Sequence, residues 1–174
     1  MSHFLFPTEY YTSTYAIDFA HYYRLGYRGI LFDIDNTLVK HNAMSDARSR
    51  TLLEILRRMG FSICFVSNNK EPRVADFVNE LKVEGLPDPV YVYKAGKPKK
   101  WGYLYGIHKM NTRKATTLFV GDQLFTDILG ANNAGIHSIL VQPIDKKEEI
   151  QIVLKRILER PIIRLYRIKH PIKG

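Results

Sequence analysis

The sequence contains a single cysteine, Cys64, among 174 residues. One thiol cannot form an internal disulfide framework, and it cannot build a thiolate metal cluster. Cys64 lies inside the apolar run Ile63–Val66, where a thiol behaves as a small buried hydrophobic side chain. We therefore expect a protein of a reducing compartment, the cytoplasm.

Long apolar segments are also missing. No stretch approaches the roughly 20 apolar residues that span a bilayer, and the N-terminus lacks a basic segment followed by an apolar one. The sequence therefore predicts neither a transmembrane helix nor a secretory signal peptide.

Acidic residues are few compared with basic ones. The chain has 17 Asp and Glu against 26 Lys and Arg, which gives a net charge of +9 and an isoelectric point near 9.6. Much of the excess lies in residues 155–174, where seven basic side chains accompany one acid, Glu159. Such a balance favours an anionic partner, such as a phosphate group, a nucleic acid or an acidic lipid.

Five short runs of β-branched and aromatic residues are typical of buried strands. They are Gly29–Phe32, Ser62–Val66, Val90–Tyr93, Thr117–Val120 and Ser138–Val141. Segments with helical periodicity lie between them, the first beginning after a cap at Ser45 or Asp46. This alternation predicts one α/β domain with a parallel sheet flanked by helices.

Polar residues follow these predicted strands, at the edge where an open parallel sheet binds its ligand. The segments concerned are Asp33–Thr37, Ser67–Asn69, Lys94–Pro98 and Gly121–Gln123. If the first and fourth strands are neighbours, Asp33, Asp35, Asp122 and Asp127 crowd one volume, and a cation must offset their charge. Oxygen ligands without histidine or cysteine favour Mg²⁺, which commonly binds substrate phosphate as well.

These residues resemble the motifs of the haloacid dehalogenase (HAD) superfamily of phosphatases. The first motif, D-x-D-x-T, matches Asp33–Thr37, and the Ser and Lys motifs match Ser67 and Lys97. The last motif, G-D-x-x-x-x-D, matches Gly121, Asp122 and Asp127. The resemblance implies a three-layer Rossmann-like core and hydrolysis of a phosphomonoester.

Residue roles follow from the same resemblance. It implies Asp33 as nucleophile and Asp35 as general acid and base, with an aspartyl-phosphate intermediate. Mg²⁺ would be held by Asp33, Asp122 and the backbone carbonyl of Asp35, and Asp127 would be an outer metal-site or Lys-orienting residue. The phosphoryl group would contact Ser67 and Lys97, with Thr37 and Asn68 as further phosphate-binding candidates.

The segments DIDNTLV, VSNN, GKP and GDQLFTDILGAN are similar to YqeG-type members of HAD subfamily IIIA, which resemble mitochondrial phosphatidylglycerophosphatases. That similarity implies dephosphorylation of phosphatidylglycerophosphate to phosphatidylglycerol at a membrane surface. Two alternatives stay open. The substrate could be a soluble nucleotide, sugar or phosphoprotein, with transfer to an acceptor other than water also possible, or the chain could be a basic RNA- or ribosome-associated adaptor on a HAD scaffold.

The spacing of the motifs predicts a core without a cap domain. Asp35 and Ser67 are separated by 31 residues, and Ser67 and Lys97 by 29, which suffices for one loop, one helix and one strand. An open site suits a phosphate that projects from a large substrate. We expect an aromatic-rich extension at 1–28 packed on the core, a phosphatase core at 29–154 and a basic tail at 155–174.

The tail interleaves basic and aliphatic residues. It could form a solvated edge strand or a disordered arm, or it could anchor the protein peripherally to an anionic membrane on the cytoplasmic side. The same charge would also attract RNA.

Overall fold

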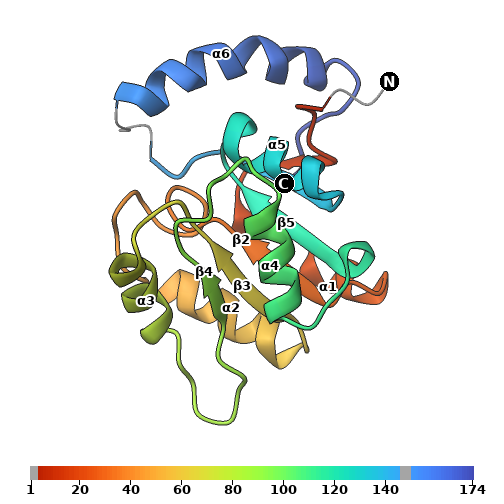
Figure 1. Cartoon of the computed structure of the whole chain (residues 1–174). Coiled ribbons are helices and arrows are strands. Elements are labelled where there is room, and N and C mark those ends of the chain that lie inside the picture. The colour runs from red at the N-terminus through yellow and green to blue at the C-terminus, as the bar shows by residue number, and fades with distance from the viewer. Residues whose placement is uncertain (1–3, 146–149) are drawn as a thin grey trace.

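The computed structural model describes residues 4–145 and 150–174 (Figure 1). Its centre is a parallel sheet of six strands in the order β1-β6-β5-β2-β3-β4. The strands are β1 (Glu9–Tyr11), β2 (Gly29–Phe32), β3 (Ser62–Val66), β4 (Val90–Val92), β5 (Thr117–Gly121) and β6 (His137–Val141). The five predicted strands are present within one residue of their predicted bounds, and the parallel sheet is confirmed.

Strand β1 was not predicted. It belongs to the N-terminal extension, of which residues 1–3 lie outside the described residues, and it forms one edge of the sheet by pairing in parallel with β6. Its three residues are too few to produce a periodic pattern in the sequence.

Helices cover both faces of the sheet, which gives the predicted three layers. Alternate strand residues point to opposite faces, so Phe32 packs among the side chains of α1 (Phe19–Arg24), α2 (Ala47–Arg58) and α3 (Glu71–Asn79). Leu31 packs instead against α4 (Trp101–Lys109) and α5 (Leu129–Ala134). Three short turns complete the core: η1 (Thr14–Ala16), η2 (Lys114–Thr116) and the wider π-helical turn η3 (Leu124–Ile128).

The predicted cap of α2 is confirmed at Asp46. Its carboxylate accepts the backbone N–H of Ser49 at 2.7 Å, and the Ser49 hydroxyl accepts the N–H of Asp46 at 3.0 Å. This reciprocal pair satisfies two of the backbone donors that a helix start leaves without intrahelical partners. One helix, α2, separates β2 from β3, and α3 separates β3 from β4.

The two ends of the described chain meet beside β1. The backbone N–H of Thr12 donates to the carbonyl of Lys173 at 2.9 Å, and the N–H of Lys173 donates to Tyr10 at 2.9 Å. Glu9 ties this region together, because it accepts the Tyr22 hydroxyl at 2.7 Å and also pairs with Lys173 and His137.

The C-terminal segment is an 18-residue helix, α6 (Ile150–Arg167), which corrects the expectation of an edge strand or a disordered arm. The division expected between residues 154 and 155 falls inside this helix. The basic residues Arg160, Arg164 and Arg167 are spaced at four and three residues, which is helical rather than strand periodicity. The helix lies across one end of the molecule as its outermost element (Figure 1).

None of the helices formed by the described residues is both long and apolar enough to span a bilayer.

Candidate functional site

The polar residues that follow β2 and β5 are brought together, as the neighbouring positions of these strands require. Phe32 and Val120 are register partners, and the N–H of Asp33 donates to the carbonyl of Val120 at 2.9 Å. Asp33 and Asp122 therefore leave the sheet side by side at its carboxyl edge.

Three aspartates form a buried acidic cluster at this edge. Carboxylate oxygens of Asp33, Asp122 and Asp127 lie within 4.8 Å of one another. Asp127 reaches the cluster from η3 across Gly121, where an added Cβ would lie 2.7 Å from the Asp127 side chain. A residue larger than glycine at position 121 would therefore displace Asp127.

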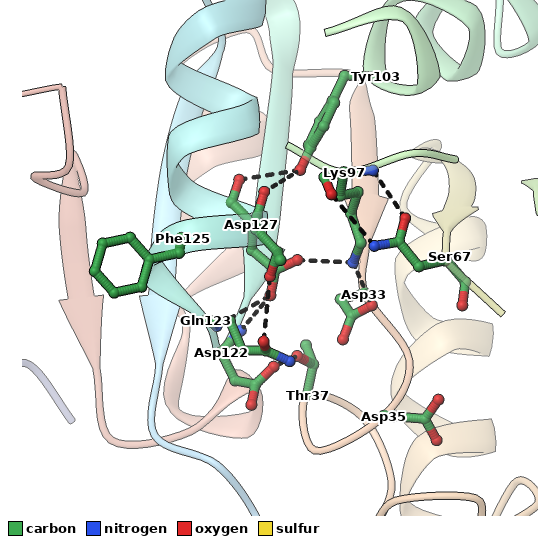
Figure 2. A network of polar contacts seen from close by, with 12 residues as sticks. Asp33, Asp35, Thr37, Ser67, Lys97, Tyr103, Asp122, Gln123, Phe125 and Asp127 are labelled. Carbon is green, nitrogen blue, oxygen red and sulfur yellow. Dashed lines mark hydrogen bonds and ion pairs between the residues drawn. The ribbon is translucent and has the colours of Figure 1, made fainter. Parts of the chain in front are cut away.

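Lys97 lies between two of these carboxylates (Figure 2). Its ammonium donates to Asp33 at 2.6 Å and to Asp127 at 2.7 Å, and its side chain is 5% exposed. Burial disfavours the ammonium, but Asp127 and Asp33 outweigh that effect and raise the pKa of Lys97. Lys97 is therefore a fixed positive charge at neutral pH.

Asn68 holds the backbone of Lys97 in place. The N–H of Lys97 donates to Asn68 Oδ1 at 2.8 Å, and Asn68 Nδ2 donates to the Lys97 carbonyl at 3.4 Å. Asn68 also lines the site cavity, so it is placed both to position Lys97 and to face a ligand.

Both carboxylate oxygens of Asp127 accept hydrogen bonds from the protein. One oxygen accepts Lys97, and the other accepts the backbone N–H groups of Asp122 at 3.1 Å and Gln123 at 3.0 Å. This pattern favours the Lys-orienting role among the two roles expected for Asp127.

Tyr103 supports the cluster from α4 and was not found from the sequence. Its hydroxyl donates to the carbonyls of Thr126 at 2.8 Å and Asp127 at 3.2 Å, and its ring packs on Phe119. It lies within a segment of helical periodicity, where nothing in the pattern distinguishes it from its aromatic neighbours.

Burial dominates the electrostatics of the cluster. It raises the pKa of Asp33 to about 7, with Lys97 opposing the rise and Asp127 adding to it. Burial likewise raises the pKa of Asp122, while the guanidinium of Arg156 opposes this rise. Additional positive charge would stabilise the ionised carboxylates.

The carboxylate of Asp35 stands apart from the cluster (Figure 2). It accepts the backbone N–H of Asn42 at 2.7 Å, the side-chain amide of Asn69 at 2.6 Å and the guanidinium of Arg73 at 3.2 Å. The family resemblance implies that Asp35 binds the metal through its backbone carbonyl alone. The placement of its side chain leaves the carboxylate available for acid and base chemistry. Arg73 is a further site residue. The sequence did not reveal it, because it is a single charged residue within a helical segment.

The expected phosphate-binding residues differ in placement. Ser67 is buried at the end of β3 and lines the site cavity, where its hydroxyl accepts the N–H of Asn69 at 3.1 Å. The hydroxyl of Thr37 instead donates to Asp122 at 3.3 Å, and Thr37 is 1% exposed. Burial against Asp122 therefore separates Thr37 from the cavity, and its contact is to the acidic cluster rather than to a phosphate.

A cavity of about 250 Å³ opens over these groups. Asp33, Asp35, Ser67 and Lys97 face it together, and Ile152 and Lys155 of α6 form part of its wall. The cavity is thus lined both by the catalytic candidates Asp33 and Asp35 and by α6, much of which the sequence analysis treated as a basic tail.

Helix α6 reaches the acidic cluster through Arg156, whose guanidinium pairs with the Asp122 carboxylate. Glu159, fully buried one turn later, accepts the backbone N–H of Leu124 at 2.8 Å and pairs with Arg156 at 3.2 Å. The sequence showed both residues only as members of a charged segment.

The donor set fits a divalent cation of the Mg²⁺ class. The cluster offers carboxylate oxygens alone, in a buried site with excess negative charge, and hard cations such as Mg²⁺ prefer such ligands. Asp33 and Asp122 are the residues that would hold the ion.

Comparisons with known proteins agree with this geometry. Residues 94–150 match the family described as HAD-hydrolase-like. The chain is 33% identical over 162 residues to the "Probable phosphatase YqeG" of Bacillus subtilis, which covers 92% of this chain and 90% of that protein. It is also 43% identical over 53 residues to the ribonucleotide monophosphatase NagD of Escherichia coli, a match that covers 30% of this chain and 20% of NagD.

Solved structures show the same fold. A hydrolase from Streptococcus pneumoniae superposes with a TM-score of 0.52 at 15% identity, covering 77% of this chain and 99% of that one. The cobalt-bound deoxy-D-mannose-octulosonate 8-phosphate phosphatase of Haemophilus influenzae superposes with a TM-score of 0.50 at 12% identity, covering 67% and 68%. With a relative of such identity and coverage, the chain belongs to the HAD superfamily of hydrolases, as a phosphatase of the YqeG type.

Proposed function

We propose that the protein is a Mg²⁺-dependent phosphomonoesterase that acts through an aspartyl-phosphate on Asp33 and takes phosphatidylglycerophosphate at the cytoplasmic surface of a membrane. The observation that carries the chemistry is the convergence of Asp33, Asp35 and Lys97 on one cavity. The lipid substrate draws its support from the resemblance to phosphatidylglycerophosphatases and from α6.

In the first step, a carboxylate oxygen of Asp33 attacks the phosphorus in line, and the bond from phosphorus to the leaving oxygen breaks. Asp35 donates a proton to that oxygen. Lys97 and Ser67 contact the phosphoryl oxygens, over which negative charge spreads in the transition state.

In the second step, Asp35 takes a proton from a water molecule whose oxygen attacks the phosphorus of the aspartyl-phosphate. Inorganic phosphate leaves and the Asp33 carboxylate is restored. A bound Mg²⁺ would supply positive charge to the phosphoryl oxygens and offset the charge of the cluster.

The outward face of α6 supports the choice of a lipid. Apolar residues on its solvent side, and one residue just beyond its end, recur at helical spacing and are 52–75% exposed; they are Leu154, Ile157, Leu158 and Leu165 on α6 and Ile168 after it. The exposed residues Arg160, Arg164 and Arg167 lie beside this apolar stripe. An apolar stripe flanked by arginines suits the boundary between acyl chains and anionic headgroups, where arginine stems lie along the apolar surface.

The same helix lines the cavity through Ile152 and Lys155. A bilayer that contacts the outward face of α6 would therefore bring headgroup phosphates close to the mouth of the site. This arrangement favours a phosphate carried by a lipid over one carried by a free metabolite.

The test measures phosphate release from phosphatidylglycerophosphate in liposomes, beside a panel of soluble phosphomonoesters, with and without Mg²⁺. We expect Mg²⁺-dependent release with preference for the lipid, and none from Asp33→Asn. Release from soluble esters alone would move the substrate to the nucleotide or sugar class. Failure with every ester, together with salt-sensitive RNA binding that Asp33→Asn leaves unchanged, would replace the enzyme with an RNA-binding adaptor.

Membrane contact is tested separately by cosedimentation with vesicles that contain phosphatidylglycerol. Leu158→Glu should greatly reduce binding. Leu25→Glu, at the C-terminal end of α1, should not. The two residues are matched in exposure, at 63% and 62%. Equal binding by both variants would contradict docking through α6.

A further inference from the structure

Arg156 connects α6 to Asp122, one of the two proposed cation ligands. Its guanidinium pairs with the carboxylate of Asp122 and also donates to the Asp122 backbone carbonyl. The Asp122 side chain is fully buried, and that of Arg156 is 14% exposed. The pair is therefore shielded from solvent, which strengthens the interaction compared with one at the surface.

The direction of Arg156 is fixed by its surroundings on α6. Glu159 Oε2 accepts Arg156 at 3.2 Å, while Glu159 Oε1 accepts the N–H groups of Leu124 at 2.8 Å and Phe125 at 3.3 Å. Glu159 thus ties α6 to the start of η3, the turn that carries Asp127. The guanidinium is aimed at Asp122 by a buried network, unlike a surface arginine that finds a partner by chance.

The place of the guanidinium gives this contact a consequence. Arg156 pairs with the Asp122 carboxylate that would hold the ion, so a cation bound there would meet a second positive charge in a buried site, where charges are poorly screened. Glu159 is a second buried carboxylate that Arg156 contacts, so the guanidinium can keep one ion pair when it gives up its hold on the Asp122 carboxylate.

We propose that Arg156 is a further residue of the active site, which competes with the divalent cation for the carboxylate of Asp122. Its pairing weakens cation binding, and cation binding requires its displacement. This inference rests on the cation site of the proposed function, and it assigns to α6 a part in setting the cation affinity of the cluster.

The experiment is a titration of the purified full chain with Mn²⁺, followed by calorimetry and by the electron paramagnetic resonance of the free ion, without substrate or membranes. We expect Arg156→Gln to lower the dissociation constant at least tenfold. Arg164→Gln removes the same charge from the solvent side of α6 and should change it less than about twofold. Arg156→Lys keeps the charge without the forked geometry and should give a smaller decrease than Arg156→Gln.

Thermal unfolding of each variant checks the fold, and Arg156→Lys carries the test if Arg156→Gln does not fold. If neither Arg156→Gln nor Arg156→Lys binds Mn²⁺ more tightly than the unchanged protein, the inference is overturned. Asp122→Asn separates the two possible failures. If it abolishes Mn²⁺ binding while the Arg156 variants show no gain, only the competition is wrong; if it leaves binding unchanged, the cation site of the proposed function fails as well.

Discussion

The ammonium of Lys97 lies 2.6 Å from a carboxylate oxygen of Asp33, although 64 positions separate the two residues along the chain. The contact exists because β2 is central in the sheet, while the loop after β4 returns over the same edge. Asp127, the second carboxylate that Lys97 contacts, belongs to a third segment, η3. The contacts of Lys97 therefore depend on the whole topology.

Replacing Lys97 by methionine should both inactivate and destabilise the protein. Asp33 and Asp127 would then face each other without a counter-ion in a buried site, at a cost of about 3 kcal/mol in the free energy of unfolding. Phosphate release should fall at least about 100-fold, since the phosphoryl oxygens lose a positive partner. Urea denaturation and a phosphate assay measure the two effects. Lys99→Met, at an exposed residue nearby, should preserve both properties, and an equal loss there would contradict the role of Lys97.

Replacing Asp33 by asparagine should stop turnover and leave the fold intact. The amide keeps the size of the side chain but is a poor nucleophile, so we expect a decrease of at least about 1,000-fold. Acid quenching with a radiolabelled substrate should trap phosphate on the unchanged protein and none on the variant. Circular dichroism checks the fold. Cation-dependent turnover by Asp33→Asn would refute Asp33 as nucleophile.

The sequence was most informative where short motifs follow strands. Buried parallel strands are continuous apolar runs, so β2, β3 and β5 could be located, and the order of motifs then indicated that Asp33, Ser67, Lys97 and Asp122 share one edge. The spacing also indicated one helix per crossover, as α2 and α3 confirm.

Residues that act through tertiary contacts could not be identified in this way. Arg73 and Arg156 occupy ordinary positions in amphipathic segments, and only the packing of α3 and α6 aims them at Asp35 and Asp122. Glu159 was the single acid of a basic segment, which marked it as an exception without indicating its backbone partners. Strand β1 was missed because pairing along β6, rather than its own pattern, makes it a strand.

Replacing Arg73 by glutamine should lower kcat and leave KM nearly unchanged. Arg73 holds the Asp35 carboxylate in place but does not contact the phosphate in the proposed reaction, so its loss misplaces the acid and base group. We expect a decrease in kcat of about tenfold, with partial rescue by Arg73→Lys. Arg58→Gln removes an exposed arginine that pairs with Glu54 and is the matched control. A change in KM alone would assign Arg73 to substrate binding instead.

Glu9 should make stability depend on pH in the acidic range. Burial would raise its pKa, but the hydrogen bonds from Lys173 and Tyr22 outweigh burial and hold the pKa below its usual value of 4.5. A carboxylate with a lowered folded-state pKa stabilises the protein above pH 4.5, and this contribution disappears as the pH falls through the lowered value. As the pH falls from 6 to 3, the free energy of unfolding measured by urea denaturation should decrease less for Glu9→Gln than for the unchanged protein. Parallel curves for the two proteins would contradict this linkage.

Helix α6 is attached to the core at two places, at its middle and in the chain beyond its C-terminal end. Glu159 fixes its middle to η3, and Lys173, six residues beyond the helix, is bonded to β1 through its backbone. A helix fastened in this way behaves as a strap rather than as a hinged arm, because swinging away would break both attachments at once. Motion at the site should therefore be confined to side-chain rotation and a small roll of the helix, so that the wall of the cavity stays in place while the charge next to Asp122 changes.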